Sequence, residues 1–482
     1  MDDPEQAKTA AQTSSEEPTV AAEVPGIVRA FLRGELSRVE PQLPGWLDTL
    51  AGVGAGECWH KKSSFKAHLY EVYKICKIWG QDDDVCRCAL FHSAYSNSYV
   101  NLAIFKEGTD RGRLAEIVGP SAEELIHTFC IVPRHNMVYD DLLARAPSAE
   151  EMAAMAAADA AAADAAAAAA SASGPGDAAP ATGTAPGASG GGGGALAAAL
   201  RRLIPEAGLT VKHIKTGEPL IVDRLTVARF LLMTMADFCE QLFSWQDAMF
   251  ENGDGSLPPF VAPNHTPNQL LSRPFAPLHL CPQPQDAMFE NGDGRLLYAG
   301  ANAGSLWPGA CRPGLWHSAL SRMGALLRHA CVDGQGRPLV RLPPVFEGCT
   351  QVLTEADQLA ARDAYWEAVT QHTEVTQHDE ALRLLRTAVW HNPHVAEPHV
   401  LLAQIHCQRG QWAEASRHAA RGVALLCEWG TAWDKRMPWE AWIAMARVLQ
   451  HGASRQQWPI TPFGMLNLGL VPGLDEPYDV VQ

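Results

Sequence analysis

The sequence lacks any run approaching the roughly 18–20 consecutive apolar residues that a membrane-spanning helix needs. The Ala-rich stretch near 153–170 comes closest in length, but it carries Asp159 and Asp164 and few large apolar side chains. The first five residues, Met1 to Glu5, are acidic, so neither a secretory signal nor a transit peptide is predicted. We therefore expect no membrane partner.

Positive charge is also scarce. The chain holds 38 Lys and Arg against 54 Asp and Glu, which gives a formal net charge of −16. Nucleic acids and anionic membrane surfaces are bound by basic surfaces, so this balance predicts no nucleic-acid partner. A local basic pocket for a phosphorylated small molecule remains compatible with it.

The 12 cysteines form no disulfide or zinc-finger framework. Cys58 with His60, and Cys86 with Cys88, are spaced like half of a zinc site, but no second pair stands at finger spacing. Nothing marks the chain for export. The cysteines are therefore expected to be reduced thiols in a cytoplasmic protein, with the nucleus and the chloroplast left open.

The chain divides into segments of different composition. Residues 1–25 are rich in Ala, Glu, Ser, Thr and Pro and are predicted to be a disordered tail. Over 27–245 apolar residues recur every three or four positions, which indicates a helical domain. An Ala/Gly-rich insert at 147–195 interrupts this domain. It has nothing large to bury, so it is predicted to be disordered, with a transiently helical start.

Residues 246–345 are predicted to form an irregular, Pro/Gly-rich connecting region that holds one short helix at Ser318–Leu327. A decapeptide at Gln246–Gly255 recurs unchanged at Gln285–Gly294. Nothing else around it repeats, so a local duplication or a gene-model error explains it better than a repeat architecture.

Residues 354–482 are predicted to be helical, with a 34-residue period over 362–427. Small residues recur along it where paired helices would approach closely, and a Gly and a Pro fall where helices would end. This pattern resembles tetratricopeptide (TPR) units, which implies a protein partner. In the alternative interpretation these helices simply pack against the rest of the protein. The residues that carry the pattern are Ala381, Leu385, Ala388, Pro393, Gly410, Ala415 and Gly422.

Three helical segments carry the residues with the most chemistry. His68 lies early in one helix, His92 follows the apolar pair Leu90-Phe91 of the next, and Asp237 ends the segment that begins at Val227. Their order and spacing resemble the HD (histidine–aspartate) metal-phosphohydrolases, in particular the branch that removes pyrophosphate from guanosine tetraphosphate. The predicted fold class is thus mostly α, an HD-like helical domain followed by TPR-like helix pairs.

The resemblance implies a divalent metal (Mn, Fe or Zn) held by His68, His92 and Asp237, which would activate water. It also implies contacts between substrate phosphates and a basic group of residues, with Ser93 and Asn97 lining the site. That basic group is His60, Lys61, Lys62 and Arg134.

The departures from the family pattern are as informative as the matches. Ser93 stands where the family has its metal-binding Asp, and Ser96-Asn97 stand where this branch carries an acidic pair. A hydroxyl is a poor ligand for a hard cation, so catalysis stays open. The site residues predict a degenerate domain that binds, or also hydrolyses, a phosphorylated small molecule such as a nucleotide. Two alternatives remain, namely histidines that are merely hydrogen-bonded on helix faces, and a non-catalytic scaffold that acts through the TPR-like helices.

The chain as a whole also resembles plant and algal proteins of unassigned function, in which an HD-like domain continues into TPR-like helices. The residues that carry this likeness are Leu306–Gly309, Arg312–Trp316 and Ser321–Gly324.

Overall fold

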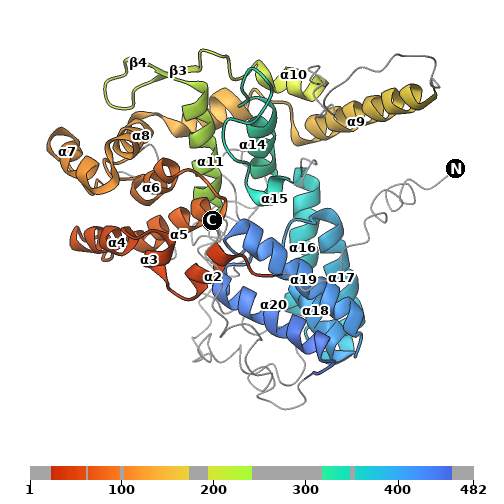
Figure 1. Ribbon diagram of the computed structural model, residues 1–482. Coiled ribbons are helices and arrows are strands. Elements are labelled where there is room, and N and C mark those ends of the chain that lie inside the picture. The colour runs from red at the N-terminus through yellow and green to blue at the C-terminus, as the bar shows by residue number, and fades with distance from the viewer. Residues whose placement is uncertain are drawn as a thin grey trace, which may run out of the picture.

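The computed structural model describes residues 23–60, 63–97, 103–172, 194–241, 317–347 and 353–458. Helices dominate these residues, and Figure 1 shows α11 (Arg224–Gln241) and α14 (His317–His329) side by side near the centre of the molecule. The expected fold class, mostly α, is confirmed. The first part of the chain forms α2 (Gly26–Leu32), α3 (Leu36–Val39), α4 (Leu43–Gly52), α5 (Phe65–Ile78), α6 (Asp83–Phe91), α7 (Glu107–Val118), α8 (Pro120–Ile131), the π-helical segment η1 (Asn136–Leu143), α9 (Ala149–Ala172), α10 (Ala195–Arg201) and α11 (Arg224–Gln241).

Two short antiparallel hairpins accompany these helices. One pairs β1 (Trp59–His60) with β2 (Ser63–Ser64), directly before α5. The other pairs β3 (Leu209–Lys212) with β4 (Pro219–Val222), directly before α11, with Leu209 opposite Val222. Each hairpin therefore delivers the chain to the start of a helix that carries a candidate site residue.

Side chains cap the two helices that form the centre of the N-terminal half. The Ser64 hydroxyl accepts the backbone N–H of Ala67 at 3.2 Å, and the Asp82 carboxylate accepts that of Val85 at 2.8 Å. Such caps satisfy donors that the first turn of a helix leaves unpaired. These local signals fix where α5 and α6 begin, and hence which residues they turn towards α11.

Helix α11 is the central element of this half. Nearly every residue from Val227 to Glu240 is buried, with Arg229 the partly exposed exception. The helix packs against α5, α6 and α14. Its polar residues Asp237 and Glu240 are therefore carried into the interior.

The first half of the insert predicted at 147–195, whose start was expected to be only transiently helical, is the 24-residue helix α9. Ala has the highest helix propensity, and a capping box starts the helix, because Ser148 and Glu151 each accept the other's backbone N–H. Met152 buries fully and anchors the first turns. The Asp159 carboxylate then accepts the first N–H groups of α10, those of Ala195 and Leu196. Residues 173–193 lie outside the described residues.

The connecting region is likewise more ordered than predicted from residue 317 onward. The expected helix at Ser318–Leu327 is confirmed as α14 (His317–His329), and α15 (Pro344–Glu347) follows. Leu320, Met323 and Leu327 are fully buried, so this segment belongs to the core. Both copies of the decapeptide lie outside the described residues.

The C-terminal helices form successive hairpins, with small residues where the helices touch. Ala381, Ala388 and Ala415 are fully buried, and a Cβ added to Gly422 would lie 2.9 Å from a Val400 methyl group. Gly410 takes a φ of +67° at the turn between two helices, a conformation that favours Gly. The TPR-like pairing of these helices is therefore confirmed. They are α16 (Glu355–Gln371), the 3₁₀ turn η5 (Val375–Gln377), α17 (His378–His391), α18 (Glu397–Gln408), α19 (Trp412–Trp429) and α20 (Trp439–Ser454).

Helix α5 also contacts the C-terminal helices. Trp79, directly after α5, is fully buried and donates its indole N–H to the Glu428 carbonyl at 3.1 Å. Lys74 is buried as well, with its ammonium 3.2 Å from Glu440 and 4.5 Å from the ring centre of Trp439. The two halves of the chain thus share packed, hydrogen-bonded contacts.

A buried polar network joins α16, α18 and the segment before α20. Tyr365 donates to Asp434 at 2.6 Å, and Arg436 forms a buried ion pair with the same carboxylate. Glu397 accepts the backbone N–H groups of Trp433 and Asp434 through one oxygen. Burial, reinforced by the Asp434 charge, raises the pKa of Glu397 from 4.5 to about 7.

This raised pKa predicts a pH-dependent stability that Glu397→Gln removes. Between about pH 4.5 and 7 the folded chain keeps the Glu397 proton and the unfolded chain does not, so stability falls as pH rises through that window. Above it the loss is complete and amounts to on the order of 3 kcal/mol. Urea unfolding at pH 5 and pH 8 gives the unfolding free energies of the variant and the wild type. The variant minus wild-type difference is expected to be more favourable at pH 8 than at pH 5 by about that amount. An equal difference at both pH values would contradict the assignment.

Candidate metal centre

Three side chains from separate helices meet in the interior of the N-terminal half. They are His68 on α5, His92 at the C-cap of α6 and Asp237 on α11. One ligand atom of each lies within 4.8 Å of those of the other two, and the residues are 1%, 2% and 6% exposed. Two ligands of one metal, each about 2.1 Å from it, lie up to about 4.2 Å apart. Small shifts of these side chains would thus suffice to hold one ion.

Both nitrogens of His68 face carboxylates. Nδ1 lies 2.7 Å from Oε2 of Glu240, and Nε2 lies 3.3 Å from Oδ1 of Asp237. A histidine that binds metal through one nitrogen usually donates the other N–H to a carboxylate, which orients the ring. Glu240 therefore stands where such a partner belongs.

Glu240 was not among the predicted site residues. The available signal was a second acid three residues after Asp237 in an otherwise apolar helix. This spacing places both carboxylates on one face of α11.

His92 is neutral and oriented. Its Nδ1 donates to the Ala89 carbonyl at 2.8 Å, because a carbonyl oxygen can only accept. Burial, partly offset by the Asp237 charge, lowers the pKa of His92 to about 3. The neutral ring therefore keeps its lone pair on Nε2, the form in which imidazole binds metals.

A buried cation lies one aromatic ring away from His92. The ring of Phe129 meets that of His92 edge-on at 5.9 Å, and the guanidinium of Arg134 lies 3.7 Å from the ring centre of Phe129. Arg134 is fully buried, and its Nη1 lies 3.4 Å from the Thr234 hydroxyl on α11. The structure thus places this predicted phosphate contact close behind the histidines.

Ser93 and Asn97 lie beside His92, but their side chains bond to each other. The Asn97 amide donates to the Ser93 hydroxyl at 2.6 Å and to the His92 carbonyl at 3.3 Å. Between them Ser96 takes a φ of +69°, which non-Gly residues seldom adopt. The amide therefore closes a tight turn directly after His92.

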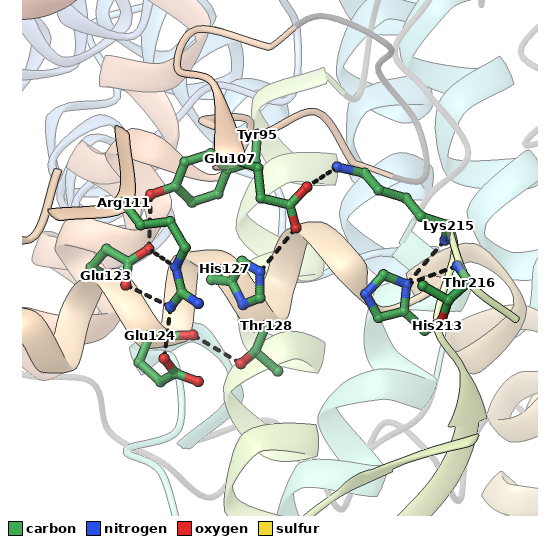
Figure 2. Close-up of polar contacts among 10 residues, drawn as sticks. All are labelled: Tyr95, Glu107, Arg111, Glu123, Glu124, His127, Thr128, His213, Lys215 and Thr216. Atoms are coloured by element: carbon green, nitrogen blue, oxygen red, sulfur yellow. Dashed lines mark hydrogen bonds and ion pairs between the residues drawn. The ribbon is translucent and has the colours of Figure 1, made fainter. Parts of the chain in front are cut away.

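An ion-pair network holds the residues that follow His92 (Figure 2). The Tyr95 hydroxyl donates to the Glu123 carboxylate at 2.8 Å. The Arg111 guanidinium donates two hydrogen bonds of 2.7 Å to the same carboxylate. Desolvation would raise the pKa of Glu123, but Arg111 and Tyr95 hold it below its usual value. The network therefore ties the His92 turn to α7 and α8.

The same network reaches the β3–β4 hairpin. Glu107 on α7 pairs with His127 at 3.0 Å and with Lys215 of the hairpin turn. The backbone N–H of Ile214 donates to the Ile131 carbonyl at the end of α8. The hairpin is thereby fixed to the helix that carries Phe129.

The remaining predicted phosphate contacts are not brought to the site by any described contact. His60 ends strand β1. Lys61 and Lys62 lie outside the described residues.

Comparisons with known proteins match two segments. Residues 49–134 match a domain of unknown function (DUF6817), and residues 373–425 match a tetratricopeptide repeat. The first segment includes His68 and His92, and the second covers α17 and α18 and most of α19. No curated protein and no solved structure matches the chain. Within the described ranges, every helix is too short or too polar to cross a membrane.

Proposed function

We propose that the N-terminal helical half is a degenerate HD-type domain that binds a divalent transition metal and, through it, a phosphorylated small molecule such as a nucleotide. The observation that carries this proposal is the meeting of His68, His92 and Asp237 within 4.8 Å. Two imidazoles and one carboxylate are ligands that suit Mn, Fe or Zn.

The hydrogen bonds around the cluster support metal binding. Glu240 and the Ala89 carbonyl engage Nδ1 of the two histidines, so a cation would be bound through their Nε2 atoms, of which that of His68 already lies 3.3 Å from the Asp237 carboxylate. If the two histidines were only hydrogen-bonded interior residues, a second buried carboxylate, that of Glu240, would not be needed beside Asp237. The buried Glu240 therefore favours a cation at this place.

The metal would supply a Lewis acid for phosphate oxygens. Arg134 would add a fixed positive charge behind Phe129, which suits an anionic ligand. Ser93 and Asn97 carry no charge and bond to each other, so neither can act as a base. Binding, rather than hydrolysis, is accordingly the activity that these residues support best.

The tag-free chain, dialysed against Mn²⁺, is expected to retain metal and to bind pyrophosphate in calorimetry only when metal-loaded. Glu240→Gln keeps the shape of the side chain but removes its charge, so the metal affinity is expected to fall about 10–100-fold. The matched control is Glu116→Gln on the exposed face of α7, which should leave it unchanged. A wild-type chain without bound metal, or pyrophosphate binding that persists in EDTA, would exclude this function.

In that case a protein-interaction role remains as the second candidate. The tetratricopeptide match indicates such a role, and large apolar side chains stay exposed on this region, with Val375 52% and Trp390 43% exposed. A metal-free wild type would make this role the preferred function.

A further inference from the structure

A second group of ligand-type side chains lies between α18 and α19, in the C-terminal half. His406 belongs to α18, while Glu414 and His418 lie one turn apart on α19. One ligand atom of each lies within 4.8 Å of those of the other two. The i, i+4 spacing on α19 places both of its side chains on one face, towards α18.

His406 provides the strongest evidence for a metal ion between these helices. It is 2% exposed, and its Nδ1 lies 2.6 Å from the side-chain oxygen of Gln411. Its Nε2 is also buried, and the residues that the structure describes offer it no hydrogen-bond partner. Buried polar atoms almost always have partners, so this nitrogen indicates an absent ligand.

In His418, as in His406, the Nδ1 atom is engaged by a neighbouring side chain. Its Nδ1 lies 2.9 Å from Nδ1 of His399, and its ring stacks on that of His406 with the centres 5.6 Å apart. When Nδ1 of His418 donates in this contact, its Nε2 keeps the lone pair that an ion needs.

We propose that His406, Glu414 and His418 bind a Zn²⁺ ion that ties α18 to α19. Two imidazoles and one carboxylate form a ligand set that zinc accepts with a fourth position open. The Glu414 side chain is 45% exposed, so the proposed site reaches the surface of the protein. Its ion pair with Arg417 uses one carboxylate oxygen and leaves the other for the ion. This site is independent of the one proposed above.

The preceding repeat unit provides an internal comparison. His372 and Glu380 lie 34 residues before His406 and Glu414, but the residue equivalent to His418 is Leu384, which is buried. That unit folds with Leu at this position. His418→Leu therefore removes a ligand and retains a side chain that this kind of helix pair accepts.

Zinc binding to the full-length, tag-free chain can be measured by competition with a chromophoric chelator at pH 7.5. His418→Leu is expected to lose one zinc per chain, both in the wild type and in the Asp237→Asn background. Glu414→Gln should weaken that site at least about tenfold, and so should Gln411→Ala, which frees the His406 ring. The control, Glu116→Gln, removes one carboxylate charge from the exposed face of α7 and should have no effect.

Unchanged zinc stoichiometry and affinity in both His418→Leu and Glu414→Gln would overturn the proposal. So would an equal loss of zinc in Glu116→Gln. If His418→Leu fails to fold, the partly exposed Glu414→Gln decides alone. A zinc lost on Asp237→Asn belongs to the first site, so the two sites are judged separately.

Discussion

Asp237→Asn is expected to weaken metal binding at the N-terminal site at least about 100-fold, more than the loss of a supporting residue costs. The change removes the only carboxylate among the three candidate ligands and leaves two neutral imidazoles. An amide oxygen has no net charge to offset the cost of dehydrating the ion. Bound Mn²⁺, counted by equilibrium dialysis and metal analysis, measures the effect.

The control for this variant lies on the same helix. Asp223→Asn makes the same chemical change just before the first residue of α11, where the Asp223 carboxylate accepts the N–H groups of Leu225 and Thr226. Asn caps helices about as well as Asp, so fold and metal binding should persist. If both variants kept the metal, the ion would be bound elsewhere. His68 and His92 would then be hydrogen-bonded interior residues and not ligands.

Asp434→Ala is expected to have the largest effect on stability, a loss of about 3–5 kcal/mol of unfolding free energy. Arg436 and Asp434 form an ion pair whose side chains are 1% and 0% exposed. Removal of the carboxylate leaves the guanidinium buried without its counter-charge, and the Tyr365 hydroxyl loses its acceptor. The loss is measured by urea unfolding, followed by the fluorescence of the Trp residues near this network.

Glu380→Ala is the matched control for this experiment. It breaks a carboxylate–arginine pair with Arg383 on α17, where the two side chains are 40% and 61% exposed. Exposed pairs contribute about 0–1 kcal/mol, so the variant should unfold almost like the wild type. Similar losses in the two variants would mean that burial of the Asp434–Arg436 pair is not what makes it important.

Features that the sequence predicted depend on local periodicity. The resemblance to the HD enzymes grouped His68, His92 and Asp237, and the apolar spacing predicted the helices that bring them within 4.8 Å of one another. The 34-residue recurrence of small residues predicted the helix pairs, because a side chain at Gly422 would collide with Val400 of the neighbouring helix.

What the sequence did not predict depends on tertiary contacts. Glu240 acts on His68 from 172 positions away, and only the crossing of α5 and α11 makes them neighbours. The stable order of helix α9 was not predicted, because its composition is that of a flexible linker, while its order rests on the Ser148 cap, Met152 and the contact with α10. The unpartnered nitrogen of His406 likewise depends on packing that no spacing reveals.

Helix α5 contacts both halves of the chain, the N-terminal half near its start and the C-terminal half near its end. His68 faces α11, whereas Lys74 and the following Trp79 bury against α19 and α20. A chain that ends before α16 would expose the fully buried indole of Trp79. It would also remove Glu440, the carboxylate with which the buried ammonium of Lys74 pairs across the two halves. The stretch matched over 49–134 is therefore not a separable module, because α5 packs on residues that lie beyond the second matched stretch. Recombining it with another protein would require the contacts of α5 to be rebuilt as well.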